Sequence, residues 1–250
     1  MGRIPGKSTG KTVIDMKLAA TRLIAEHGFE GMNLRMLADD IGVKAGSLYN
    51  YIDNKQSLLH ELLSDTMKEI IDGLDTALAA AQDPHDALQR FVAFHIEFHA
   101  VRRDAVFIGN AELRSLSAAQ RQDIVALRDG YEARLRQILR DGVATGAFNP
   151  GDIRIASHAL IAMLSGVCYW YQPGGRHSVA QLVRQYTRLV LCCVGASLTV
   201  TGKTSPGTKA KKSVNPTGPI SPTGPTVHAT GRTSSRRKSR VKDLTELPPV

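Results

Sequence analysis

The stretch IGVKAGSLYNYIDNKQSLL, residues 41–59, decides the fold of the N-terminal part of the chain. It continues the segment NLRMLADD (33–40), in which Asn33 is predicted to cap a short helix that ends at Gly42. A second short helix, AGSLYNY (45–51), follows the tight turn GVK. Two short helices joined in this way form the helix-turn-helix layout, whose second helix enters the major groove of DNA.

The second short helix has one apolar face and one small, polar face. Helical spacing turns Ala45, Leu48 and Ile52 toward the preceding helices and leaves the other face, with Gly46, Ser47 and Asn50, outward. Glycine permits a close approach to DNA, while hydroxyl and amide groups hydrogen-bond base edges or phosphates. The alternative is that these residues merely connect two helices.

Three further side chains extend this predicted surface. Tyr49 and Tyr51 offer hydroxyls to phosphates and rings that pack on sugars or thymine methyl groups. Lys55 starts the next helix, where its ammonium and the free backbone N–H groups are both suited to a phosphate.

The first 200 residues are predicted to be all-α. The segment TVIDMKLAATRLIAEHG (12–28) places apolar residues at helical spacing and ends at a glycine; these residues are Ile14, Leu18, Ala19, Leu23 and Ile24. Longer periodic segments follow at 55–81, 84–102, 118–145, 152–170 and 176–199. We therefore expect a three-helix helix-turn-helix domain over 12–57 and a helical ligand-binding and dimerisation domain over 58–200.

Composition points to a soluble, cytoplasmic protein without a membrane partner. We find no apolar run of transmembrane length, and the N-terminal MGRIPGKSTGK lacks the apolar stretch of a signal peptide. The three cysteines, Cys168, Cys192 and Cys193, lie in apolar helix-like segments and give no disulfide framework.

The positive charge is concentrated at the C-terminus. Residues 201–250 hold ten Lys or Arg against two acids, which is +8 of the total +9, and seven of the eleven prolines. This composition predicts a disordered tail. Its cluster RRKSR (236–240) is predicted to bind a polyanion, with a solubilising role as the alternative. The basic N-terminal arm (1–11), with Arg3, Lys7 and Lys11, is predicted to reach phosphates or an adjacent minor groove.

At the N-terminus the sequence resembles the TetR family of transcriptional regulators. The resemblance covers roughly residues 12–63 and rests on AATRLIAEHGFEGMNLRMLADDIGVKAGSLYNYIDNKQSLL (19–59). The family often has His-Phe at Tyr51–Ile52 and Ser or Thr at Asn33. The resemblance implies phosphate contacts from Asn33 and Arg35, and DNA-backbone contacts from Tyr51 and Lys55. It also implies that the groove is read or braced by Lys44, Ser47, Tyr49 and Asn50.

The segment FVAFHIEFHAVRR (91–103) is the first candidate for effector recognition. It places Phe91, Phe94, His95, Phe98 and Arg102 at helical spacing. Such a stripe is either a core face or the wall of a cavity for an apolar ligand with an anionic head. His95 and His99 could share a metal, but the only third ligands nearby are Glu97 and Glu112, so we predict no metal and no cofactor.

A second, less specific resemblance concerns the effector. FHAVRRDAVF (98–107), FIGNAELRSLS (107–117), the helix with Arg128, Tyr131 and Arg134, and CYWYQPGGR (168–176) resemble TetR-like regulators that respond to acyl-CoA thioesters of fatty-acid or sterol breakdown. This resemblance implies phosphate contacts from Arg102 or Arg128 and an apolar pocket lined by Phe91, Phe94, Phe98, Phe107 and Trp170. The alternative for WYQPGG is a helix end packed by aromatic rings.

The last two long segments predict a homodimer. DIRIASHALIAMLSGVCYWY (152–171) and SVAQLVRQYTRLVLCCVGASL (178–198) are apolar over a wide arc, which marks an interface. Paired about a two-fold axis they form a four-helix bundle, and a symmetric dimer suits a palindromic operator in double-stranded DNA.

Two rival functions compete with that of a ligand-released repressor. An enzyme would need a nucleophile motif, a glycine-rich phosphate loop or paired carboxylates, and the sequence has none of these. An architectural DNA-binding protein that uses the basic tail is the remaining alternative.

Overall fold

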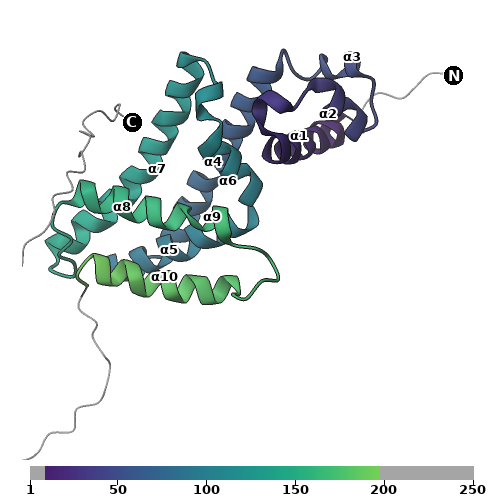
Figure 1. Cartoon of the computed structure of the whole chain (residues 1–250). Helices are drawn as coiled ribbons and strands as arrows, with labels where there is room; N and C mark the ends of the chain where they lie inside the picture. The colour runs from purple at the N-terminus through teal and green to yellow at the C-terminus, as the bar shows by residue number, and fades with distance from the viewer. Residues whose placement is uncertain (1–8, 197–250) are drawn as a thin grey trace, which may run out of the picture. The chain divides into compact units, whose positions relative to one another are not determined.

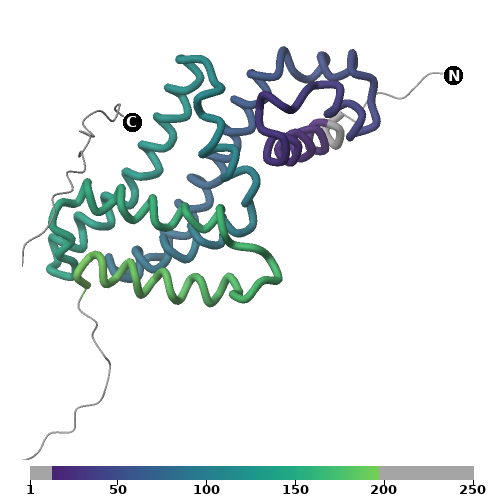
Figure 2. The backbone as a smooth tube through the Cα atoms, in the orientation of Figure 1, coloured from purple at the N-terminus to yellow at the C-terminus, as the bar shows by residue number. Residues whose placement is uncertain are grey.

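The computed structural model describes residues 9–196, and within this range the chain is helical and contains no strand (Figure 1, Figure 2). The predicted all-α class is therefore confirmed. The predictions for the basic tail (201–250) and for Arg3 and Lys7 of the N-terminal arm fall outside the described residues.

Three helices form the N-terminal domain: α1 (Thr9–Gly31), α2 (Leu34–Asp40) and α3 (Ala45–Leu48). Asn33 caps α2 as predicted, because its side-chain oxygen accepts hydrogen bonds from the backbone N–H groups of Arg35 and Met36. At Gly28 the backbone leaves the helical conformation, with φ of 73°, and the chain then turns toward α2. The predicted glycine terminator thus lies inside α1 as a kink.

The second part of the chain holds eight helical elements: α4 (Lys55–Leu78), α5 (Pro84–Val101), α6 (Arg103–Ala111), η1 (Leu113–Ser115), α7 (Ala118–Ala144), α8 (Ile153–Ser165), α9 (Val167–Trp170) and α10 (Val179–Cys193). Three differences from the sequence prediction concern α6, α9 and α10. The predicted segment 84–102 ends where α5 does, but α6 and η1 fill the interval before the next predicted segment, 118–145, and were not predicted. The predicted helix 152–170 is divided at Gly166, and α10 begins later than predicted, after a capping box at Ser178.

The described residues build two apolar cores. One lies in the second part of the chain and centres on α5, with Phe91 and Ile96 fully buried. The other lies among α1, α2 and α3, where Leu48 and Ile52 are buried as predicted. This second core also takes in residues from beyond these three helices, namely four leucines of α4 (Leu58, Leu59, Leu62 and Leu63) and Ile108, Leu116 and Ile124. The helix-turn-helix is therefore completed by side chains of α4, α6, α7 and the connection between α6 and α7.

The predicted apolar face of α1 is partly wrong. Ile14 and Leu18 are 61% and 58% exposed, whereas Met16 and Ala20 are buried. The true core face at this end of the helix is therefore rotated away from the predicted one. The sequence does not determine this rotation, because Ile14, Met16 and Leu18 are all apolar and each is suited to a buried position.

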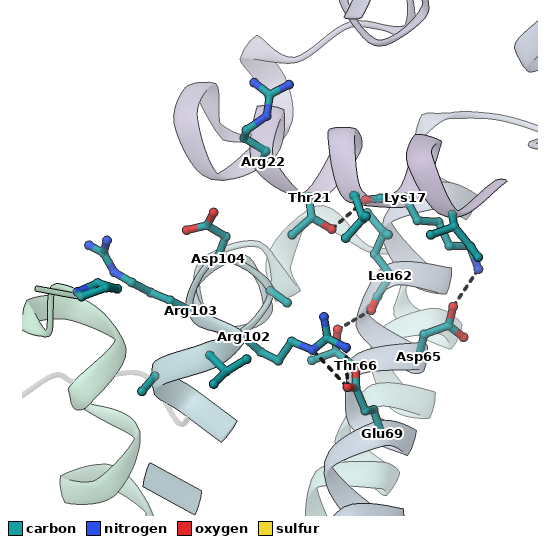
Figure 3. Close-up of a pocket in the computed structure, with 16 residues that line it drawn as sticks. Lys17, Thr21, Arg22, Leu62, Asp65, Thr66, Glu69, Arg102, Arg103 and Asp104 are labelled. Carbon is teal, nitrogen blue, oxygen red and sulfur yellow. Dashed lines mark hydrogen bonds and ion pairs between the residues drawn. The ribbon is translucent and has the colours of Figure 1, made fainter. Parts of the chain in front are cut away.

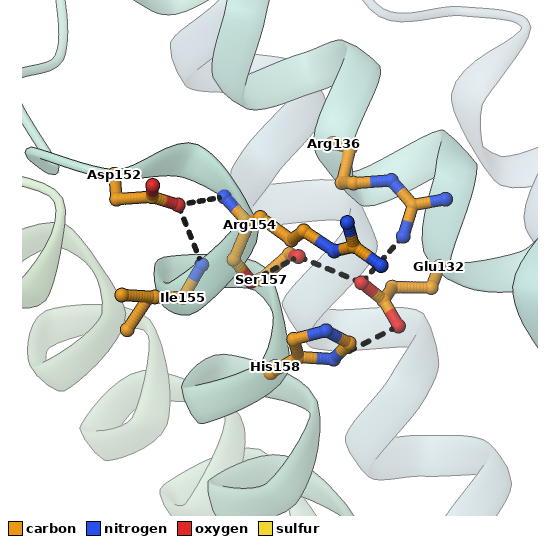
Figure 4. Close-up of polar contacts among 7 residues, drawn as sticks. All are labelled: Glu132, Arg136, Asp152, Arg154, Ile155, Ser157 and His158. Carbon is orange, nitrogen blue, oxygen red and sulfur yellow. Dashed lines mark hydrogen bonds and ion pairs between the residues drawn. The ribbon is translucent and has the colours of Figure 1, made fainter.

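The rotation of α8 is set by a buried polar contact (Figure 4). Ser157, which is fully buried, donates a 2.8 Å hydrogen bond to Glu132 of α7. The Glu132 side chain, only 13% exposed, also pairs with Arg136 at 2.6 Å and with His158 at 3.2 Å. A buried carboxylate needs such partners, so this cluster fixes which face of α8 points inward.

The opposite face of α8 is apolar and exposed. Ile155 is 70% exposed, Tyr169 and Trp170 of α9 are about half exposed, and Ala159 and Ala162 also face outward. By length and composition alone, residues Ile153–Trp170 are long and apolar enough to span a membrane. Only 28% of this stretch is buried within the described structure. The expectation that the chain has no apolar run of transmembrane length was therefore wrong for this stretch. An exposed apolar face is equally what a subunit interface requires.

Gly142 offers a test of the packing near the end of α7. A Cβ atom at this position would overlap the ring of Phe148, which is 3% exposed. We expect Gly142→Ala to destabilise the protein by about 1–3 kcal/mol in urea unfolding, because overpacking outweighs alanine's helix preference. Gly130→Ala on the same helix meets only the tip of Arg134, at 3.9 Å, and should be neutral or stabilising. Equal effects of the two substitutions would contradict this account.

Candidate functional site

The helix predicted over 45–51 is shorter in the structure, because α3 ends at Leu48 and residues 49–51 form a turn, but the predicted outward face of this segment is exposed. Tyr49 is 61% exposed, and Gly46 and Asn50 are exposed beside it. Ser47 and Tyr51 are half-buried, while Leu48 anchors the helix in the core. The orientation of the helix is thus confirmed, and its contacts with DNA stay a prediction.

The start of α2 and the turn before α3 extend the same candidate surface. Asn33, Arg35 and Lys44 are exposed. The oxygen of the Asn33 side chain is occupied by the helix cap, so its amide N–H groups are the donors left for a phosphate. No side chain caps α3, whose N-cap is Lys44.

Lys55 differs from its predicted role. Its ammonium donates hydrogen bonds to the carbonyls of Phe29, at 2.7 Å, and Met32, at 3.1 Å, and lies 4.3 Å from the centre of the Phe29 ring. In this structure Lys55 therefore ties the start of α4 to the end of α1. Its contact with phosphate stays a prediction, but its removal would also disturb the fold.

The predicted effector residues fall into two groups. Phe91, His95 and Phe98 are buried, and Phe94 packs against Gly73 of α4, so the phenylalanine stripe belongs to the core. The others are more accessible: Phe107 and Arg128 are half-buried, and Arg102 and Trp170 are exposed. The structure thus favours a core role for the stripe in the conformation that it describes.

A polar network runs through this core. His95 Nδ1 lies 2.9 Å from the hydroxyl of Tyr131, and His95 Nε2 lies 3.3 Å from Ser165 Oγ. His99 Nδ1 donates to the carbonyl of His95 at 2.8 Å, and the two imidazoles stack at 3.8 Å. Burial lowers the pKa of both histidines, that of His99 to about 4, so both are neutral near neutral pH.

The stacked histidines do not form a chelating pair. The nitrogen lone pairs of an imidazole lie in the plane of its ring, and the two ring planes here are nearly parallel. The lone pairs of the two rings therefore do not point to one common position, as two ligands of a metal ion must. Within residues 9–196 there is no group of three or more potential metal ligands.

The two predicted phosphate-binding arginines are both engaged with protein groups. Arg128 donates to the carbonyl of Gly109 at 2.7 Å and thereby links α7 to α6. Arg102 donates to Oε1 of Glu69 from both Nε, at 3.0 Å, and a terminal nitrogen, at 2.6 Å. Arg102 is nonetheless exposed, and an anionic ligand would compete with Glu69 at that site.

A cleft of about 560 Å³ lies among α1, α4 and the junction of α5 with α6 (Figure 3). Of the predicted effector residues, Arg102 is the one that lines it. The cleft combines three exposed aliphatic side chains with seven charged ones: Ile14, Leu18 and Val101, then Lys17, Arg22, Arg102, Arg103, Asp65, Glu69 and Asp104. Sequence reasoning missed this site because its walls come from segments far apart in the chain.

A short outward helix on a three-helix unit, followed by a helical domain with its own core, defines the helix-turn-helix class of transcription regulators. Residues 18–62 match the family described as "Bacterial regulatory proteins, tetR family", and residues 81–194 match the domain described as "Tetracyclin repressor-like, C-terminal domain". The chain belongs to the TetR family of bacterial regulatory proteins.

Individual relatives agree with this assignment. The HTH-type transcriptional repressor KstR2 of Rhodococcus jostii is 29% identical over 188 residues, covering 74% of this chain and 91% of the relative. The fatty acid metabolism regulator protein of Bacillus subtilis is 24% identical, covering 69% and 90%. The solved structure of the TetR family transcriptional regulator PfmR from Thermus thermophilus is 30% identical, with a TM-score of 0.66, covering 71% of this chain and 97% of its own. The protein is a DNA-binding regulator and not an enzyme.

Proposed function

We propose that the protein is a cytoplasmic repressor that binds a palindromic operator as a homodimer and is released by a small molecule. The observation that carries this proposal is the outward face of α3 and the turn that follows it, where Gly46, Tyr49 and Asn50 are exposed around the buried anchor Leu48. The relatives named as transcriptional repressors support the direction of regulation. A non-specific architectural protein would need no such shaped face.

Replacing Tyr49 with alanine tests the proposal at its centre. We expect the affinity for an operator selected from random duplexes to fall by about 5- to 150-fold, which corresponds to the roughly 1–3 kcal/mol contributed by one side chain that binds DNA. The thermal stability should not change, because Tyr49 is 61% exposed. Tyr49→Phe then separates the hydroxyl from the ring. Unchanged operator affinity of Tyr49→Ala would contradict the docking of α3, and equal affinity for operator and random duplexes would favour the architectural alternative.

The dimer that we propose forms through α8 and α10. The outward face of α8 and α9 carries Ile155, Ala159, Ala162 and Trp170, and that of α10 carries Leu189 and the exposed thiols of Cys192 and Cys193. Two copies of these helices would cover each other as a four-helix bundle. The pairing would place two copies of α3 about a two-fold axis, as a palindrome requires.

For the effector we propose an acyl-CoA thioester with a long-chain or steroid-like acyl group. The name of the B. subtilis relative, a fatty acid metabolism regulator, supports this class. Phe98 and Arg102 lie four residues apart, so one face of α5 runs from the phenylalanine core to the charged cleft. The apolar group would enter the core and the phosphates would meet Arg102. Since the phenylalanines are packed against one another, the acyl group can enter only if they move apart. The ligand would therefore bind one conformation of the protein better than the other and shift the equilibrium toward it.

A panel of thioesters tests this effector class. We expect acyl-CoA to dissociate the protein from its operator, while free CoA and the free fatty acid have little effect. Arg102→Gln should weaken the response by about ten-fold, because charge-assisted hydrogen bonds contribute about 1.5–3 kcal/mol. Arg121→Gln, at an exposed position of α7, serves as the charge-matched control. Release by another chemical class, with no response to the thioesters, would exclude the acyl-CoA proposal.

A further inference from the structure

The junction between the helix-turn-helix and the effector domain is organised around the backbone of Phe29. Its N–H donates a 3.0 Å hydrogen bond to Oε1 of Glu112, which follows α6. Its carbonyl accepts the 2.7 Å hydrogen bond from Lys55 at the start of α4. The N–H and the carbonyl of one residue are thus both held by side chains that are distant in the sequence.

The sequence explains why this backbone is available. The kink at Gly28 interrupts the helical conformation directly before Phe29, so the peptide groups that follow it need other partners. The Phe29 ring is 6% exposed in the core of the N-terminal domain, which fixes the position of its backbone. A displacement of Glu112 would therefore pull on the Phe29 backbone, which is anchored in the helix-turn-helix by the buried ring.

Glu112 is itself held in place. Its second oxygen accepts a 2.8 Å hydrogen bond from Ser115 Oγ, and the carbonyl of Ser115 accepts one from Gln56 of α4 at 2.9 Å. Because the carboxylate accepts on both oxygens, its orientation is determined by two elements together.

The other end of α6 is tied to the effector domain. Arg103 donates to the carbonyl of Cys168 in α9 at 3.2 Å, and the Phe107 ring meets Tyr169 edge-on at 6.0 Å. Arg128 of α7 holds the carbonyl of Gly109. A shift of α9 or α7 would therefore move α6, and with it Glu112.

We propose that Glu112 is the positioning residue that couples the effector domain to the DNA-binding helices, through its hydrogen bond to the backbone of Phe29. This inference rests on the proposed function, because it assumes that DNA occupancy and the position of α6 are linked. Linkage is reciprocal: if α6 affects DNA binding, DNA binding must affect α6 by the same coupling free energy. The coupling can therefore be measured without knowing the effector.

Hydrogen–deuterium exchange on the full-length protein provides the test. In the absence of DNA, Glu112→Ala should speed exchange at the Phe29 amide by roughly 5- to 10-fold, the effect of removing one hydrogen bond. Glu112→Gln should restore slow exchange, since its amide oxygen can still accept from Phe29. Glu97→Ala removes an exposed carboxylate from α5 and is the charge-matched control.

A selected operator duplex then separates coupling from simple structural support. In the wild-type protein, Glu97→Ala and Glu112→Gln, DNA should protect both the α2–α3 amides and those of residues 108–116. In Glu112→Ala the α2–α3 protection should persist while the protection of residues 108–116 falls to the DNA-free level. Equal protection of residues 108–116 in Glu112→Ala and wild type, or no such protection in wild type, would overturn the inference. Loss of α2–α3 protection in every variant, wild type included, would instead contradict the proposed function.

Discussion

Replacing Ala162 with glutamate is expected to convert the dimer into monomers and to abolish operator binding. Ala162 is exposed on the outward face of α8, so a single chain can accommodate glutamate without a change in its core. In the proposed dimer the same carboxylate would be buried without a partner. An uncompensated buried charge costs roughly 3–5 kcal/mol, and two-fold symmetry imposes it twice.

The dissociation constant of the dimer should therefore rise by at least about 100-fold. Operator binding should fall with it, because a monomer contacts one half-site only. Sedimentation equilibrium and a gel-shift titration would measure the two effects. Ala119→Glu, at an exposed position in the first turn of α7, is the matched control and should leave both unchanged. A dimeric Ala162→Glu variant with wild-type operator affinity would show that α8 is not the interface.

The second large effect concerns the basic tail. Deleting residues 203–250 removes +8 of the net charge of +9. Counterion release ties non-specific affinity to the number of neutralised phosphates, so the truncated protein should bind random duplexes at least about ten-fold more weakly at low salt. The slope of log affinity against log salt should become shallower by about 0.9 for each phosphate that the tail neutralises in the full-length protein.

Preference for operator over random DNA should stay constant or rise on truncation, because base contacts specify and phosphate contacts only position. The melting temperature should change little. A full-length variant in which the basic residues of RRKSR (236–240) are replaced by glutamine separates charge from chain length. Identical salt slopes for the truncated and full-length proteins would show that the tail does not touch DNA.

Local signals made the helix-turn-helix predictable from sequence. Asn33 as a cap, Leu48 and Ile52 as core residues and Tyr49 as an exposed one all follow from chemistry within a few residues. Helix capping and periodic burial act over one or two turns, so a short segment contains enough information.

Interactions between distant segments were not predictable in the same way. The sequence suggests phosphate as the partner of Lys55, because only the fold brings the carbonyls of Phe29 and Met32 to its ammonium. Glu112 is a candidate third metal ligand by residue type alone, yet it holds the backbone of Phe29, which lies 83 residues away. The cleft among α1, α4 and α6 was missed for the same reason.

The apolar residues of the effector domain show a further limit. Spacing identified the stripe of Phe91, Phe94 and Phe98, but a packed core and a ligand pocket have the same pattern in sequence. In the described conformation these residues are packed, with Phe91 at 0% exposed. Periodicity identifies which face of a helix is apolar. It does not show whether that face packs against other side chains or lines an open pocket.

The shared core of the helix-turn-helix has a consequence for building biosensor chimeras. A graft cut after α4 would transplant Leu48, Phe29 and their neighbours without Ile108, Leu116 and Ile124, which close the same cluster. The transplanted module would then expose apolar surface where α6 and α7 pack in this protein. The position of α3 would depend on how well the helices of the new host cover that surface. A working exchange of DNA specificity in this protein should therefore replace the outward residues of α3 alone and leave the joint with α6 in its native form.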